Sequence, residues 1–169
     1  MRRRATIDDT ARARMNEVVR LVAVVLTLSV ACARSSAEDL LSRPPSTVSF
    51  EGTDAVLYVD VASTSEDKRR GLMGVEELPT DQGMAFAWDE PVDSTFWMKD
   101  TLIPLSIAFV DEEGRVITIR EMKPCTGDPC PTYAASGPYV LAIEANAGWF
   151  ERHDVGVGDR AELRVSAYG

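Results

Sequence analysis

The residues best placed to do chemistry lie in the stretch STFWMKDT, where Lys99 stands two residues after Trp97 and two before Thr101. Glu144 and Asn146 follow on the polar side of a later alternating run, YVLAIEAN. One interpretation is a shallow pocket with Trp97 as a flat wall and Lys99, Glu144 and Asn146 as orienting polar groups. The alternative is a lysine stem packed on apolar surface, with its ammonium in water or paired with Glu144.

Two further sets of residues could react. Cys125 and Cys130 lie in the loop PCTGDPCP, which predicts a structural disulfide in an oxidising compartment. A redox-active pair is the alternative, although the spacing is not C-x-x-C. The one histidine, His153, stands among charged residues and is expected to be a solvated surface side chain. No His/Cys/carboxylate set has the spacing of a zinc site, so we expect no metal and no cofactor.

Strands dominate the elements that must position these residues. Period-two alternation marks residues 55–62, 105–110, 115–120, 139–146 and 160–167 as strands. The sequence DEEG predicts a hairpin turn at Gly114, with Leu105, Ile107 and Phe109 on one arm facing Ile117 and Ile119 on the other. In the last run, Ala161, Leu163, Val165 and Ala167 are predicted to point inward.

Helix is scarce after residue 46. STSEDKRRG predicts one short helix, with Ser63 or Thr64 as its cap and Gly71 at its end, and a second turn is predicted to start at Asn146. The fold class predicted is mainly β: a single antiparallel β-sandwich or barrel-like domain over residues 47–169, with one or two short helices. Each sheet is expected to have one face in water.

The N-terminal region predicts export. Eleven uncharged, mostly apolar residues (21–31, LVAVVLTLSVA) follow Arg20, a length that suits a secretory signal rather than a membrane-spanning helix. LSVAC resembles a lipobox, so residues 1–32 are predicted to be a lipoprotein signal, with Cys32 lipidated and anchored on the periplasmic side of a membrane. Alternatively, cleavage within ACA, ending at Ala33, would release a secreted protein. Met15 is an alternative start.

Residues 33–46 are polar and proline-ended, which predicts a flexible tether. After Cys32 the chain carries 12 basic and 24 acidic residues, a net charge of −12. Because affinity for nucleic acid comes from Lys and Arg on phosphates, this balance argues against nucleic acid as a partner. The partners expected are the membrane, through the anchor, and an unknown small ligand or envelope protein.

Four segments, RGLMGVEELPTDQGMAFAW, FWMKDTLIPLSIAFVDEEGRVITI, PCTGDPCPTY and NAGWFERHDVGVGD, resemble a bacterial and archaeal family, domain of unknown function number 192. The resemblance covers about residues 48–165 and implies a compact, mostly antiparallel β domain without an established activity. Matching positions include Arg70, Lys99, Thr101 and Glu144, which packing alone explains poorly. Asp100 stands where the family more usually has Asn, and Ser106 where Asp is often found.

The function expected is therefore an exported, membrane-tethered domain that binds a ligand without catalysis or acts as an envelope accessory protein. Its candidate contact residues are Arg70, Trp97, Lys99, Thr101, Glu144 and Asn146. The alternatives are a hydrolase that uses Glu144 beside Lys99 and a thiol oxidoreductase that uses Cys125 and Cys130.

Overall fold

The structure is a computed structural model that describes residues 46–166. The predicted signal peptide, Cys32 and nearly all of the predicted tether lie outside the described residues. The elements are β1 (Ser46–Phe50), β2 (Val56–Ala62), α2 (Ser65–Arg70), β3 (Gln82–Val92), β4 (Phe96–Trp97), β5 (Leu105–Val110), β6 (Val116–Met122), β7 (Thr132–Tyr133), β8 (Tyr139–Asn146), α3 (Trp149–Arg152) and β9 (Ala161–Arg164).

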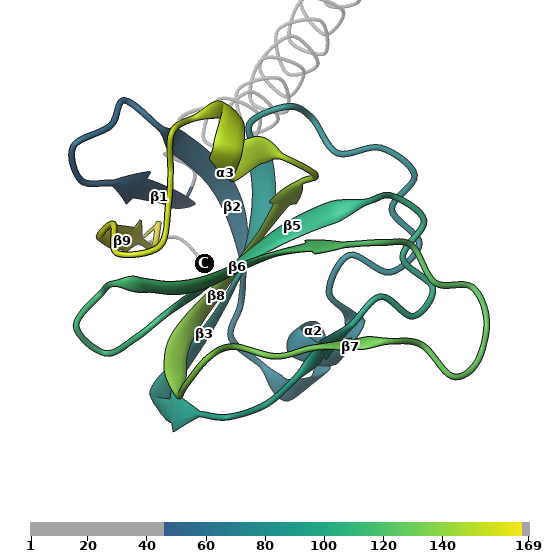
Figure 1. Cartoon of the computed structure of the whole chain (residues 1–169). Coiled ribbons are helices and arrows are strands. Elements are labelled where there is room, and N and C mark those ends of the chain that lie inside the picture. Colours follow the sequence, from purple (N-terminus) through teal and green to yellow (C-terminus); the bar gives the residue numbers. More distant parts are fainter. Residues whose placement is uncertain (1–45, 167–169) are drawn as a thin grey trace, which may run out of the picture. The chain divides into compact units, whose positions relative to one another are not determined.

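One strongly curled sheet dominates the fold (Figure 1). Its seven strands have the order β6-β5-β8-β3-β2-β1-β9, and a separate two-stranded ribbon joins β4 to β7. The curl brings the two edge strands together at one end, where Arg115 and Arg160 form an isolated bridge and the Val116 amide donates to the Asp159 carbonyl at 2.8 Å. The mainly β, barrel-like class predicted from the sequence is confirmed.

The sheet departs from the prediction in one pair of strands. β2 and β3 run parallel, with Val59 opposite Gly83 and Ala62 opposite Phe86, whereas every other neighbouring pair in this sheet is antiparallel. A parallel pair needs a crossover connection, and the segment that contains α2 provides it. The prediction of an antiparallel sheet is confirmed for the other pairs and is wrong for this one, because β3, which lacks clear alternation, was not recognised as a strand.

Two hydrophobic clusters pack on opposite faces of the sheet. Along β5, Ala108 and Val110 belong to the first cluster, with Trp149, while Ile107 and Phe109 belong to the second. All six residues of β5 are buried, and so are six of the eight in β8. The expectation that each sheet leaves one face in water is therefore wrong for these central strands.

The hairpin between β5 and β6 forms as predicted, with Gly114 at φ 76°. The cross-strand contacts differ in detail, because Ile119 lies opposite Ala108 and packs against the first cluster. Only Ile117 packs with the second cluster, to which Ile107 and Phe109 belong. A register shift between Phe109 and Val110 accounts for this division. Phe109 pairs with Thr118 and Val110 with Val116, so Ile117 is an extra residue in β6 without a partner in β5.

The short helices follow local sequence signals. The Asp67 amide donates to the Thr64 hydroxyl at the start of α2, and Gly71 ends this helix at φ 49°. α3 begins at Trp149, three residues later than the turn predicted from Asn146. Within residues 46–166 no helix is long and apolar enough to span a membrane.

In the last strand Ala161 and Leu163 are half-buried, but Val165 is 59% exposed, and Ala167 lies outside the described residues.

Gly83 lies where the backbones of β3 and β8 approach each other closely. A Cβ at this position would lie 2.2 Å from the Glu144 carbonyl oxygen and 2.8 Å from Leu57 Cδ2. We expect Gly83→Ala to lower the free energy of unfolding by about 1–3 kcal/mol, because backbone cannot move aside without strain. Gly137→Ala is the matched control, since a Cβ there meets no atom within 4 Å. Equal stability of the two variants in urea unfolding would contradict this packing.

Candidate functional site

Glu144 lies in the middle of the sheet. It belongs to β8, opposite Met84 of β3 and Ile107 of β5, and its side chain is only 4% exposed. Among the described residues, no hydrogen bond to its carboxyl group is formed. Burial without a compensating partner disfavours the charged form, so desolvation raises the pKa of Glu144 from the ordinary 4.5 to about 8. The carboxyl group is therefore mostly protonated at neutral pH.

A small cavity gives Glu144 its remaining access to solvent. Its volume is about 30 Å³, enough for ordered water or one small polar group. Phe86 and Phe96 provide apolar wall. Thr101, 5% exposed, provides a hydroxyl whose one hydrogen-bond partner within residues 46–166 is the Lys99 carbonyl at 3.5 Å. Two polar groups with spare hydrogen-bonding capacity, from Glu144 and Thr101, thus share one cavity.

The segment after β4 turns Thr101 into this cavity. The ladder ends at Trp97, and Met98 is buried in the second cluster. Asp100 takes a left-handed conformation at φ 55°, which Asp and Asn tolerate better than other side chains. Its amide donates to the Cys125 carbonyl at 3.0 Å, and its carbonyl accepts from the Gly74 amide at 2.9 Å. The wall of the cavity is thus tied to two other loops.

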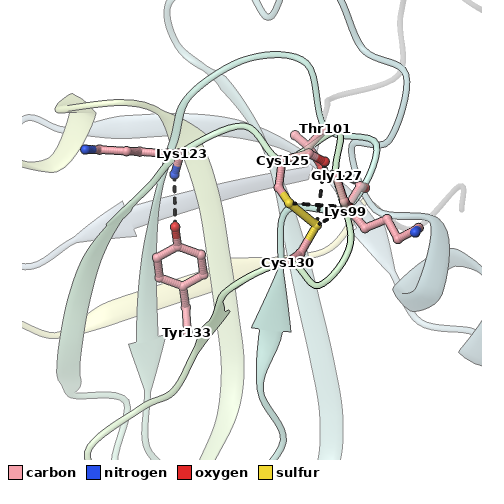
Figure 2. The surroundings of a disulfide bond; sticks show 7 residues. All are labelled: Lys99, Thr101, Lys123, Cys125, Gly127, Cys130 and Tyr133. Atoms are coloured by element: carbon pink, nitrogen blue, oxygen red, sulfur yellow. Dashed lines mark hydrogen bonds between the residues drawn. A yellow bond between two sulfur atoms is a disulfide. The ribbon is translucent and has the colours of Figure 1, made fainter.

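One of these loops is closed by a disulfide between Cys125 and Cys130, as predicted (Figure 2). Lys99 forms a parallel bridge with Cys125, and Figure 2 shows its side chain extending away from the two sulfur atoms. No helix within residues 46–166 begins at either cysteine to lower a thiol pKa. The arrangement fits a structural bond that supports the backbone of residues 99–101.

Two shallow hollows of about 330 Å³ each adjoin the cavity. Arg69 and Trp97 line both hollows and the cavity itself, so the three spaces meet at these side chains. Trp97 is 48% exposed, a large apolar surface to leave in water. We call these three spaces the Trp97 site; its principal lining residues are Lys68, Arg69, Arg70, Met73, Phe86, Trp88, Phe96, Trp97, Lys99, Thr101 and Glu144.

The structure brings together most of the residues predicted from the sequence. Arg70, Trp97, Thr101 and Glu144 line the small cavity, and Lys99 lines an adjoining hollow. Within the described residues, Lys99 and Glu144 form no ion pair. The Asn146 side chain lies elsewhere: its Nδ2 donates to the carbonyls of residues 78 and 79, at 2.9 and 3.0 Å, and so holds the preceding loop against β8.

Sequence reasoning missed the contribution of Lys68, Arg69, Phe86 and Trp88. The two cations were considered only as part of the predicted helix STSEDKRRG, and the aromatic residues lie on β3, which was not predicted. Lys68 Nζ lies 4.7 Å from the centre of the Trp88 ring. The available signals were the basic run KRR at residues 68–70 and the two aromatic residues in GMAFAW at residues 83–88.

His153 takes part in a separate structural group. Its ring stacks on that of Trp149 at 4.2 Å, and its Nε2 lies 3.6 Å from the Asp81 carboxylate, which also accepts from Trp149 Nε1. The ring is thus half-buried against the end of α3 rather than fully solvated. Within residues 46–166, no three His, Cys, Asp or Glu side chains gather as a metal site.

The comparisons with known proteins agree with this architecture. The family DUF192, described as Uncharacterized ACR, matches residues 47–163. The chain belongs to this family. A crystal structure of a protein of unknown function from Novosphingobium aromaticivorans DSM 12444 is similar: TM-score 0.63, 34% identity, 71% of this chain and 84% of that one. A putative transcription regulator from Sinorhizobium meliloti 1021 has TM-score 0.63 and 28% identity over 72% of this chain and 95% of that one. No curated protein matches the chain.

Glu144 should make stability depend on pH. The unfolded chain releases the Glu144 proton near pH 4.5, whereas the folded chain holds it to about pH 8, so the unfolded state binds fewer protons between these values. We expect the free energy of unfolding to fall with rising pH across this window, by up to roughly 1.4 kcal/mol per pH unit, relative to Glu144→Gln. Urea unfolding at several pH values measures it. Parallel curves for the two proteins would contradict a protonated Glu144.

Proposed function

We propose that this DUF192 protein is an exported, lipid-anchored domain that binds a small ligand in the Trp97 site without catalysing a reaction. One observation supports this most: Glu144 is only 4% exposed, its carboxyl group lacks a hydrogen-bond partner within residues 46–166, and it lines a cavity. An unpaired polar group in a sheet interior is destabilising, and folding alone does not require it.

The surroundings of Glu144 suit binding. A ligand group that enters the cavity can accept from the protonated Glu144 and exchange a hydrogen bond with Thr101. Trp97 offers a flat apolar face at the entrance. Convergent polar groups at the bottom of an apolar recess are the usual composition of a small-molecule site.

Export and anchoring rest on the N-terminal sequence, which precedes the described residues. The apolar run at residues 21–31 ends immediately before Cys32, and a polar, proline-ended segment then leads to the domain. The disulfide supports the same compartment, because such bonds persist mainly outside the cytosol.

The similar protein from Sinorhizobium meliloti is described as a putative transcription regulator. We do not extend this role to the present chain. After Cys32 it carries 24 acidic and 12 basic residues, and such a balance repels the phosphates of DNA.

A hydrolase is the second candidate, because the pKa of Glu144 is raised to about 8 by burial, a value that suits a general acid. Within residues 46–166, the cavity lacks other groups that a hydrolase would use. Lys99 lines the adjoining hollow rather than the cavity, and no second carboxylate or histidine lines the cavity among the described residues. Binding therefore remains the better-supported function.

A fluorine NMR titration tests binding. The full chain labelled with 5-fluorotryptophan contains three tryptophans: Trp97 and Trp88, which both line the site, and the fully buried Trp149 as an internal reference. The probes are benzoate, benzyl alcohol, benzylamine, glucuronate and methyl glucoside. We expect at least one to shift the Trp97 signal saturably while Trp149 stays fixed. Trp97→Phe identifies the signal.

Two variants at the cavity floor sharpen the result. Glu144→Gln keeps a neutral donor and acceptor and should retain the binding. Glu144→Leu removes both and should weaken, roughly tenfold or more, the binding of probes that place a hydroxyl group in the cavity: benzyl alcohol, glucuronate and methyl glucoside. Unchanged binding of these three probes by Glu144→Leu, or no shift of Trp97 with any probe, would contradict the proposal. Conversion of a probe into products in the same samples would instead favour the hydrolase.

Lipidation predicts a membrane location that depends on one residue. In a bacterial host fed an alkyne-labelled fatty acid, the wild-type chain should incorporate the label and sediment with membranes. Cys32→Ser should lose both properties, because the thiol that carries the lipid is absent. Unlabelled, soluble wild type whose mature N-terminus lies at residue 34 would instead support ordinary signal cleavage after Ala33.

A further inference from the structure

We infer that the ligand of the Trp97 site is a small organic anion, with its flat apolar part on Trp97 and its anionic group between Arg69 and Lys99. This inference rests on the proposed binding function and adds the chemical class of the ligand. It is carried by the distribution of charge over the described residues, which is independent of the Glu144 observation.

Basic residues are concentrated at this site on an otherwise acidic domain. Residues 46–166 contain 10 basic and 22 acidic residues. Four of the ten basic side chains line the Trp97 site: Lys68, Arg69 and Arg70 from α2, and Lys99. A local positive field on a negative surface directs small anions to this place and repels them elsewhere.

Two of these four cations have interactions of their own. Arg70 Nη2 lies 3.2 Å from Asp67 Oδ1, and Lys68 Nζ donates to the Ser63 carbonyl at 3.0 Å while lying over Trp88. Arg69 and Lys99 form no ion pair within residues 46–166. Both line the same hollow, with Trp97 as its apolar wall, so their donors are available to an anionic group.

The acidic groups at the site limit the charge of the ligand. Glu66 and Asp100 line the same hollow as Arg69 and Lys99, and both carboxylates are exposed. Glu144 adds no negative charge at neutral pH, because desolvation raises its pKa to about 8. Because Arg70 is paired with Asp67, three cations against two carboxylates leave a small positive excess, which suits a small anion better than a polyanion.

The volumes of the cavity and the hollow determine which part of the ligand fits in each. The cavity at Glu144, about 30 Å³, is too small for a ring and admits only a small polar substituent. The hollow of about 330 Å³ between α2 and Trp97 is large enough for a six-membered ring against the indole. An aromatic carboxylate or an acidic sugar has the required flat face and single anionic group.

The charge-matched probes decide the class. In the fluorine NMR titration of the full chain, benzoate should bind at Trp97 roughly tenfold more tightly than benzyl alcohol or benzylamine, and glucuronate more tightly than methyl glucoside. Raising the salt concentration should weaken benzoate binding and leave benzyl alcohol unchanged. Arg69→Gln and Lys99→Gln should each remove most of the preference for benzoate.

Arg164→Gln is the matched control. Arg164 is an exposed arginine of β9 that pairs with Glu162 and lies outside the three spaces, so its loss should not change benzoate binding. If Arg164→Gln weakened benzoate binding as much as Arg69→Gln does, the weakening would come from the overall charge of the protein, and the inference would be overturned. Saturable binding at Trp97 led by benzylamine or benzyl alcohol would also overturn it while the proposed binding function stands. Silence of all five probes would contradict both.

Discussion

The central strand β8 is hydrogen-bonded on both sides, to β3 and β5, and buried on both faces, and the rest of the fold is arranged around it. Ile143 and Ala145 face the first hydrophobic cluster, and Ala142 faces the second. At the six buried positions of β8 the side chains are removed from water, so a carboxylic acid there must be neutral, paired or in contact with a cavity. Glu144 is the one acidic residue of β8, and it contacts the small cavity of the Trp97 site.

The site combines a rigid floor with walls from less regular segments. Glu144 is fixed by the ladder, whereas Trp97, Lys99 and Thr101 lie at and beyond the end of a two-residue strand. Backbone hydrogen bonds from the loops at Gly74 and Cys125 hold this segment in place. A binding surface built from loops on a firm sheet is a common arrangement, because loops can vary while the sheet keeps their positions.

Two positions at which this chain departs from the usual family residues have physical explanations. Asp100 adopts a positive φ, which Asn and Asp both tolerate, so the exchange preserves the turn. The Ser106 hydroxyl accepts from the Gly148 amide at 2.7 Å and donates to Glu121, whose carboxylate also accepts from Gly148 at 3.2 Å. An aspartate could accept from the same amide, but a second carboxylate beside Glu121 would be repelled.

The sequence by itself determined the local features: the hairpin at Gly114, the cap of α2 at Ser63 or Thr64, the disulfide, and the candidates Trp97, Thr101 and Glu144. Each depends on residues close together in the chain or on a periodicity that survives in a single strand. Only the tertiary structure decided that β2 and β3 run parallel and that β8 is buried on both faces. The tertiary structure also decided that the Asn146 side chain donates to the loop at residues 78 and 79, and that the cations of α2 lie beside Trp97. These outcomes depend on which distant strands become neighbours, and alternation within one strand cannot specify its partners.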